Sequence, residues 1–156
     1  MTIPWAGKTI LIVDDSELIR KQLTLLYETF NLKIAGYAKN GVEALEAYDR
    51  LHPDIVSMDI IMPEMHGLNC YAELKKSDPN IKLLFVSCLV VNHIITDDML
   101  AEIPRELFIS KPPDNRSIQH ALELLFGLHS TQSNRPQPEK TRNTDKHESR
   151  PPSQPD

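Results

Sequence analysis

Short apolar runs that each end in a polar residue recur along this chain. The runs are rich in Ile, Val, Leu and Phe and are too short for typical helices, so they predict buried strands. They span residues 9–13, 54–58, 81–86 and 107–110, and the polar residues that follow them are Asp14, Asp15, Asp59, Ser87 and Lys111. The carboxyl ends of parallel strands share one edge of a sheet, and ligands of open α/β sheets bind there. These five side chains are therefore expected to converge.

The residue types in this predicted cluster indicate its chemistry. Three carboxylates held close together need a compensating charge, and a hard cation with oxygen ligands supplies it. Mg²⁺ takes one or two carboxylates together with phosphate oxygens, and an aspartate beside a bound phosphoryl group can attack phosphorus to form an aspartyl phosphate. A lysine and a hydroxyl can then bind the equatorial oxygens. The sequence thus predicts a magnesium and phosphoryl site.

Strand and helix patterns alternate five times over the first 128 residues. Besides the four runs, a strand is expected over 33–38, with helices over 16–30, 42–51, 68–76 and 117–128. This alternation predicts an α/β fold, a doubly wound parallel sheet with helices on both faces. The segment 89–106 fits the pattern least well. A short helix is expected over 92–99, and Ile103-Pro104 must end it, because proline biases its predecessor away from helix.

The composition changes abruptly near His129. From His129 to Asp156 the chain has no Ala, Val, Ile, Leu, Met, Phe, Trp, Tyr or Cys and contains five prolines. Such a segment cannot bury enough apolar surface to offset the entropy lost on ordering, so a disordered polar tail is expected over 129–156. Residues 1–128 then form one domain, and the 156 residues leave no room for a second.

Charge and cysteine content argue against several classes of protein. The 17 basic and 22 acidic residues give a net charge of -5, unlike the basic surface of a DNA-binding protein. No apolar stretch approaches the roughly 20 residues of a membrane helix, and the start lacks a signal-peptide pattern. Cys70 and Cys88 have no zinc-type spacing, and free thiols fit a reducing compartment. A cytoplasmic protein that binds neither DNA nor membrane is expected.

Five motifs together resemble one family. They are the double aspartate in Ile10–Ser16, then Asn40–Leu45, then Pro53-Asp54 leading to Asp59–Pro63 and Gly67, then Ser87, and finally Lys111-Pro112. In this order and spacing they resemble the receiver domain of response regulators, the CheY-like superfamily, in its stand-alone form. The resemblance covers about residues 7–128 and implies a flavodoxin-like, five-stranded parallel sheet of strand order 2-1-3-4-5.

The resemblance also implies roles at the site. Asp59 would accept a phosphoryl group from a histidine kinase or a phosphotransfer protein. Mg²⁺ would be bound by Asp15 directly, by Asp14 largely through water, by Asp59, and by the backbone carbonyl of Ile61. Lys111 would hold Asp59 and then the phosphoryl group.

A conformational switch is implied as well. Ser87 would bond a phosphoryl oxygen and pull on the loop that follows it, and the aromatic ring of Phe108 would turn inward as that loop moves. The bond before Pro112 is expected to be cis. The resulting change would be read by a downstream protein through the fourth helix, fifth strand and fifth helix. Such a protein is no metabolic enzyme, because it catalyses only its own phosphorylation and dephosphorylation.

Several positions depart from the family pattern. Pro113 stands where an aromatic residue usually follows Lys-Pro, Cys88 where a small residue often follows the hydroxyl, and His66 where an acidic residue often precedes Gly67. The segment 99–106 replaces the usual Ala/Gly-rich run before the fifth strand. These changes affect the fourth helix and the expected partner surface, and they leave the five-residue set intact.

Three alternative functions remain open at this point. A relay intermediate would pass its phosphoryl group on to another histidine. A small-molecule phosphotransferase or phosphohydrolase is disfavoured because the chain has no cap domain to enclose a substrate. A pseudo-receiver that only binds partners is disfavoured by the complete set of Asp14, Asp15, Asp59, Ser87 and Lys111.

Overall fold

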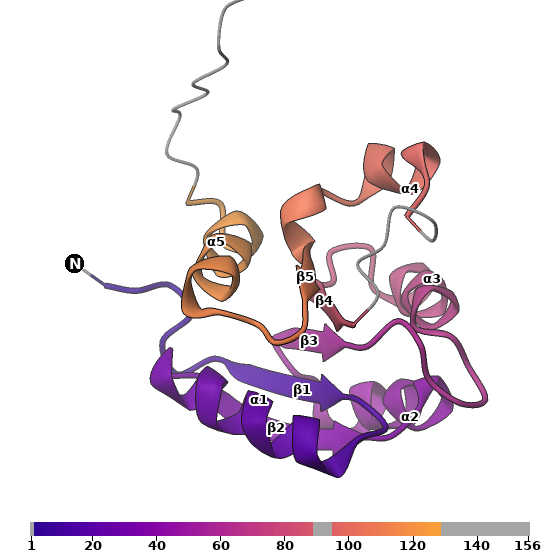
Figure 1. The fold of residues 1–156 in the computed structure, drawn as a ribbon, viewed down its shortest axis with the longest axis horizontal. Coiled ribbons are helices and arrows are strands. Elements are labelled where there is room, and N and C mark those ends of the chain that lie inside the picture. The colour runs from indigo at the N-terminus through magenta and orange to yellow at the C-terminus, as the bar shows by residue number, and fades with distance from the viewer. Residues whose placement is uncertain (1, 89–94, 129–156) are drawn as a thin grey trace, which may run out of the picture.

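A five-stranded parallel sheet forms the centre of the protein (Figure 1). The computed structural model describes residues 2–88 and 95–128. The strands are β1 (Thr9–Val13), β2 (Lys33–Ala38), β3 (Ile55–Met58), β4 (Leu83–Ser87) and β5 (Phe108–Ser110). Their order in the sheet is β2-β1-β3-β4-β5, which confirms the predicted fold class and topology. Because β1 and β3 are neighbours although β2 lies between them in the chain, the strand order reverses there, and that is the expected place for a ligand site.

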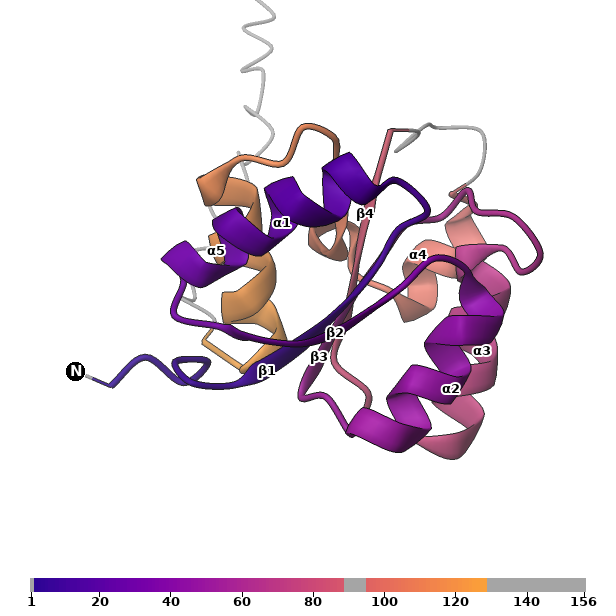
Figure 2. The same cartoon turned by 90° about the horizontal axis from the view of Figure 1, so that it is seen from below.

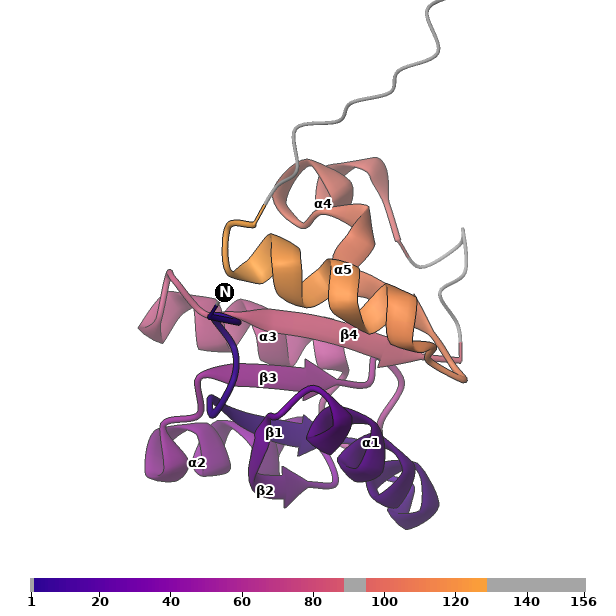
Figure 3. The ribbon, with the colours of Figure 1, turned by 90° about the vertical axis from the view of Figure 1, so that its left-hand side faces the viewer.

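Helices cover both faces of this sheet. Figures 2 and 3 show α1 and α5 on one face, with α2, α3 and α4 on the other. The helices of the described residues are α1 (Glu17–Thr29), α2 (Gly41–Leu51), α3 (Gly67–Ser77), α4 (Asp97–Glu102) and α5 (Asn115–Leu125), and a 3-10 turn, η1, lies at Arg105–Leu107. With both faces covered, the strands β1, β3 and β4 are almost wholly buried, which explains why the sequence shows them as continuous apolar runs.

Side-chain caps fix where the helices begin. The side chain of Ser16 accepts a hydrogen bond from the Ile19 backbone N–H at the start of α1, and Asp114 accepts one from the Ser117 N–H, at 2.7 Å, at the start of α5. The predicted helix over 117–128 was therefore placed too late. It also ends earlier, at Leu125, because Gly127 takes a left-handed conformation with φ of 71°.

The segment before β5 also differs from the expectations. Of the short helix expected over 92–99, only residues 95–99 are described, and there the helix is α4, Asp97–Glu102, which starts where the Thr96 side chain accepts a hydrogen bond from the Met99 N–H. It ends at Glu102, with Ile103 as its C-cap, so it stops before Pro104 as predicted. The turn η1 then takes up Leu107, so β5 starts at Phe108. Residues 89–94, and the expected tail over 129–156, lie outside the described residues.

The single tryptophan closes the core at the amino ends of the strands. Trp5 precedes β1, is only 6% exposed, and packs against Phe126 beyond the end of α5, with 6.3 Å between the ring centroids. The polar residues that follow the strands lie at the opposite edge. Within the described parts of the chain, no helix has both the length and the apolar character needed to cross a bilayer.

Candidate functional site

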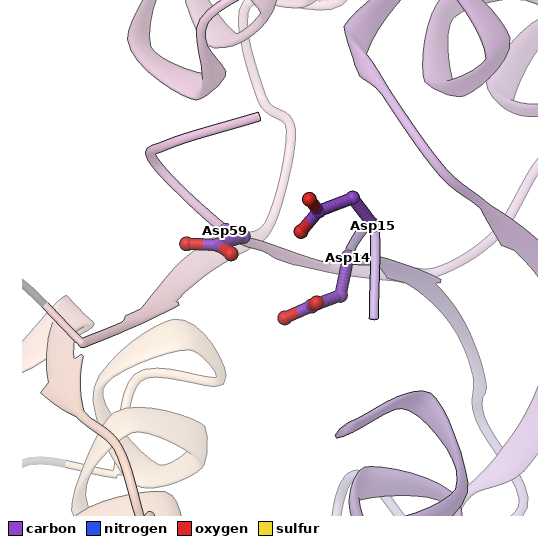
Figure 4. A group of neighbouring side chains, drawn as sticks. All are labelled: Asp14, Asp15 and Asp59. Atoms are coloured by element: carbon purple, nitrogen blue, oxygen red, sulfur yellow. The ribbon is translucent and has the colours of Figure 1, made fainter. Parts of the chain in front are cut away.

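Three carboxylates meet at the carboxyl edge of the sheet (Figure 4). Asp14 and Asp15 follow β1, Asp59 follows the adjacent β3, and one oxygen from each lies within 4.8 Å of the others. The Asp59 N–H donates to the Val13 carbonyl at 2.9 Å, which extends the strand pairing and holds the two ends together. Asp14 and Asp59 are buried, whereas Asp15 is exposed. Two buried like charges and a third beside them require positive charge nearby.

Lys111 supplies one such charge from the loop after β5, the edge strand of the sheet. Its Nζ donates to Asp14 Oδ2 at 2.5 Å and to Asp59 Oδ2 at 3.0 Å, and its side chain is 9% exposed. Lys111 follows β5, so its long stem crosses the end of β4 to reach the acids. Burial opposes its charge most strongly, but the hydrogen bonds and charges of Asp14 and Asp59 together outweigh burial and raise the pKa of Lys111. Lys111 is therefore positively charged at neutral pH.

Burial has the larger influence on Asp14. It raises the pKa of the Asp14 carboxyl, even though the hydrogen bonds from Lys111 and from the Ser16 backbone act in the other direction. A carboxylate in this position is stabilised by further positive charge. Oxygen-rich sites of this kind suit hard divalent cations, because Mg²⁺ prefers carboxylate and carbonyl oxygens. The donor set therefore fits the expected magnesium ion.

Ser87 and Phe108 lie on the two strands between Asp59 and Lys111. Ser87 ends β4, is 1% exposed, and accepts a hydrogen bond from the Lys111 N–H through its carbonyl at 3.0 Å. The Phe108 ring is turned inward and stacks on Phe85, with centroids 5.1 Å apart and an angle of 8° between the rings. The Lys111-Pro112 peptide is cis, as predicted.

The loop from Ile60 to His66 follows Asp59. A hydrogen bond of 2.8 Å from the Gly67 N–H, at the start of α3, to the Ile60 carbonyl closes this loop. A Cβ at position 67 would overlap the Asp59 carbonyl oxygen, so only glycine allows this approach. Ile61 is 45% exposed. His66, which replaces a common acidic residue, caps α3 by accepting a hydrogen bond from the Leu68 N–H at Nδ1, 3.3 Å away.

Two features near the acids were missed from the sequence. The guanidinium of Arg20 in α1 donates through Nη1 to the Asp14 carbonyl, at 2.8 Å. The hydroxyls of Tyr27 and Ser57 form a buried hydrogen bond of 2.6 Å beneath the site. A signal for the second was present, because Ser57 interrupts an otherwise apolar run. Its partner could not be predicted, since Tyr27 is 30 residues away and has a helical spacing typical of core residues.

Comparison with known proteins agrees with this geometry. Residues 10–123 match the family model of the response regulator receiver domain. The chain belongs to this receiver-domain family. The receiver domain is 39% identical over 116 residues to the chemotaxis protein CheY of Thermotoga maritima, which covers 74% of this chain and 95% of that protein. It is 33% identical over 116 residues to CheY of Halobacterium salinarum, with 74% and 94% covered.

Solved structures give the same result for the receiver domain. It matches a chain in the crystal structure of the CheX-CheY-BeF3-Mg+2 complex from Borrelia burgdorferi with a TM-score of 0.69 and 30% identity, covering 78% of this chain and 90% of that one. The response regulator domain of Thermotoga maritima CheB matches with a TM-score of 0.59 and 31% identity, covering 78% and 93%. This chain is thus a CheY-like receiver domain of a two-component signalling system.

Proposed function

We propose that this receiver domain accepts a phosphoryl group on Asp59 from a histidine kinase or a phosphotransfer protein, and then controls a downstream protein. The observation that carries the proposal is the position of Lys111, whose ammonium binds Asp59 and Asp14 at once beside the exposed Asp15. An ammonium bound to only one carboxylate would be an ordinary buried ion pair. An ammonium shared by two carboxylates of a three-acid cluster suits a site where a cation and a phosphoryl group bind.

The transfer step follows from these residues. An ionised oxygen of Asp59 attacks the phosphorus of a phosphohistidine in line, the phosphorus–nitrogen bond breaks, and its electron pair stays on the imidazole nitrogen. Lys111 is already bonded to Asp59 and can follow the charge onto the phosphoryl oxygens, while the Ser87 hydroxyl donates to one of them. Mg²⁺, held by Asp14, Asp15, Asp59 and the Ile61 carbonyl, would neutralise charge on the phosphoryl oxygens. Positioning and charge are what this chemistry needs most.

A surface beside Lys111 suits docking of the phosphodonor. A cavity of about 510 Å³ lies between α1 and the loop after β5, and its lining includes Ile19, Leu26, Cys88 and Pro113. Cys88 and Pro113, which both depart from the family pattern, are among the residues that line this cavity. An apolar face of a helix that carries the phosphohistidine would bury these groups while it presents phosphorus to the acids. We propose this surface as the contact with the donor.

The downstream partner would bind through α4, β5 and α5. Phe108 in β5 packs on Phe85, so a change in the position of the Phe108 ring would alter both the packing of the core and the surface at β5. The expected movement of the loop after Ser87 concerns residues 89–94, which lie outside the described residues. The free thiols of Cys70 and Cys88 support the proposal of a cytoplasmic protein.

A relay intermediate remains the second candidate, and Ile61 favours it. In the family, the side chain at this position flanks the path of the water that hydrolyses the aspartyl phosphate. The Ile61 side chain is exposed but apolar, so it cannot orient a water. A long-lived aspartyl phosphate suits onward transfer to another histidine, and transfer assays with purified phosphotransfer proteins would distinguish the two roles. Turnover of a generic phosphate monoester would instead indicate a small-molecule phosphohydrolase.

Labelling with acetyl phosphate tests the proposal. With Mg²⁺ present, the wild type should gain one phosphoryl group by mass spectrometry, and Asp59→Asn should gain none. The matched control is Asp54→Asn, because Asp54 accepts a hydrogen bond from the Thr9 N–H at the other end of β3 and should not affect labelling. Full labelling of Asp59→Asn, or labelling that survives removal of metal by a chelator, would refute the proposal.

A further inference from the structure

Apart from tyrosine, four polar or charged residues are buried in the described parts of the chain, and three of them belong to the site. These three are Asp14, Asp59 and Ser87. The fourth is Ser57, which is 1% exposed and lies in β3, two residues before Asp59. The other three residues of β3 are apolar. A buried polar residue in such a strand costs stability unless it is hydrogen-bonded, so its bond must be accounted for.

The partner of Ser57 is Tyr27 of α1. Their hydroxyls are 2.6 Å apart, and Tyr27 is fully buried; we call these two residues the hydroxyl pair. Long side chains of a helix lean toward its amino end, and α1 begins just after the acids. The Tyr27 phenol therefore reaches back toward the site. Burial first, and the charge of Asp14 in addition, raise the pKa of Tyr27, although the hydrogen bond with Ser57 acts in the other direction.

The amino end of α1 is hydrogen-bonded to the other half of the site. The Ser16 N–H donates to Asp14 Oδ1 at 2.9 Å, and Arg20 Nη1 donates to the Asp14 carbonyl at 2.8 Å. The helix is thus joined to Asp14 at its start and, through the hydroxyl pair, to β3, the strand that Asp59 follows. Helix α1 connects the two buried acids by directional bonds as well as by apolar packing.

We propose that the hydroxyl pair positions Asp59 relative to Asp14, and so sets the geometry of the site for the cation and the phosphoryl group. This inference rests on the proposed function of Asp59. Apolar burial is non-directional and lets a helix slide on a sheet, whereas a hydrogen bond fixes both distance and angle. A displacement of about 1 Å at a reacting group can cost roughly 100-fold in rate. Tyr27 and Ser57 are positioning residues, since neither would contact the phosphoryl group.

Three variants separate positioning from simple stability: Tyr27→Phe, Ser57→Ala and the double variant. Each single change leaves one buried hydroxyl without its partner, so the urea midpoint of unfolding should fall. The double variant removes both hydroxyls and should recover most of the midpoint, because no unpaired group remains. If the hydroxyl pair only satisfied the core, function would recover too. The proposal expects labelling of Asp59 by acetyl phosphate to stay roughly tenfold slower in the double variant, and Mg²⁺, measured by calorimetry, to bind more weakly.

Tyr48→Phe is the matched control. The Tyr48 hydroxyl donates to Asp78 Oδ2, also at 2.6 Å, between α2 and the end of α3, far from the acids. The Tyr48→Phe variant should have a lower urea midpoint, and its labelling and Mg²⁺ binding should stay within twofold of wild type. A double variant that labels and binds Mg²⁺ like the wild type would overturn the inference and leave a purely structural pair. Asp59→Asn is measured in the same assay to separate a failure of this inference from a failure of the proposed function. Labelling of Asp59→Asn would contradict the proposed function, whereas normal labelling of the double variant would contradict only the role of the hydroxyl pair.

Discussion

Replacing Lys111 by methionine removes the only ammonium that contacts the acids in the described structure and keeps most of the apolar stem. In metal-free buffer the buried carboxylates of Asp14 and Asp59 then lose their counter-charge. Two unit charges 4.8 Å apart repel by about 3.5 kcal/mol at an effective dielectric constant of about 20. This repulsion acts between Asp14 and Asp59, which are both buried, whereas the charge of exposed Asp15 is screened by water. We therefore expect a large destabilisation.

Protonation sets the upper limit of that loss. From its ordinary pKa of 3.8, a carboxyl costs about 4.4 kcal/mol to protonate at about pH 7, which is less than the repulsion by Asp59 and the several kcal/mol of desolvation of a buried, unpaired charge combined. Asp14 will therefore take up a proton, and the loss should be about 4 kcal/mol, similar to other broken buried pairs. Burial already raises the pKa of Asp14, and loss of Lys111 raises it further. Stability tied to a raised pKa is recovered as pH falls, so the loss should shrink by up to about 2.7 kcal/mol at about pH 5.

Urea denaturation of both proteins with a chelator present, at the two pH values, measures this loss. Lys76→Met is the control, because Lys76 pairs with Glu73 at 2.8 Å with both side chains at least half exposed, and should cost no more than about 0.5 kcal/mol at either pH. A loss for Lys111→Met as small as that of the control, or one that does not change with pH, would refute the electrostatic reasoning. Addition of Mg²⁺ should restore part of the lost stability, because it binds only the folded state.

Further changes test other parts of the structure. A thiol reagent at mildly alkaline pH should modify exposed Cys88 and spare Cys70, because burial and the nearby charge of Glu73 raise the pKa of the Cys70 thiol to about 12; two adducts on the native protein would contradict this. Gly67→Ala should lower the free energy of unfolding by roughly 1–3 kcal/mol, because the added methyl overlaps the Asp59 carbonyl oxygen; an unchanged urea midpoint would show that the loop can move aside. Ile61→Asn, alone or with Leu89→Glu outside the described residues, should quicken decay of radiolabelled phosphoprotein by roughly tenfold, about 1.4 kcal/mol of barrier; a wild type that already decays within seconds would contradict the expected slow hydrolysis.

Sequence patterns predicted the sheet well because buried parallel strands have a simple pattern. Continuous apolar runs located β1, β3, β4 and β5 to within two residues at either end, and the polar residue after each run fixed which side chains share an edge. The meeting of Asp14, Asp59 and Lys111 follows from topology alone. No local signal was needed beyond the strand ends and the strand order, and the order was implied by the resemblance to the receiver family.

The errors have equally local causes. Helix α4 was placed too early because Thr96, which caps it, is one of several possible starts in 89–106. Arg20 was missed because a basic residue on a helix is usually a solvated one, and its bond to the Asp14 carbonyl depends on the side-chain conformation. The link between Tyr27 and Ser57 depends on how α1 lies across β3, which no short window of sequence contains.

The place of Trp5 determines what optical spectroscopy can report. The only tryptophan is packed on Phe126 at the amino ends of the strands, and the acids lie at the carboxyl ends. Its emission should change sharply when the domain unfolds, because an indole that is 6% exposed then enters water. Binding of a cation or a phosphoryl group at the far edge should leave the emission almost unchanged. Fluorescence titrations of this receiver domain will need a dye or a second indole introduced near the acids, and the natural indole can serve as an internal reference for folding.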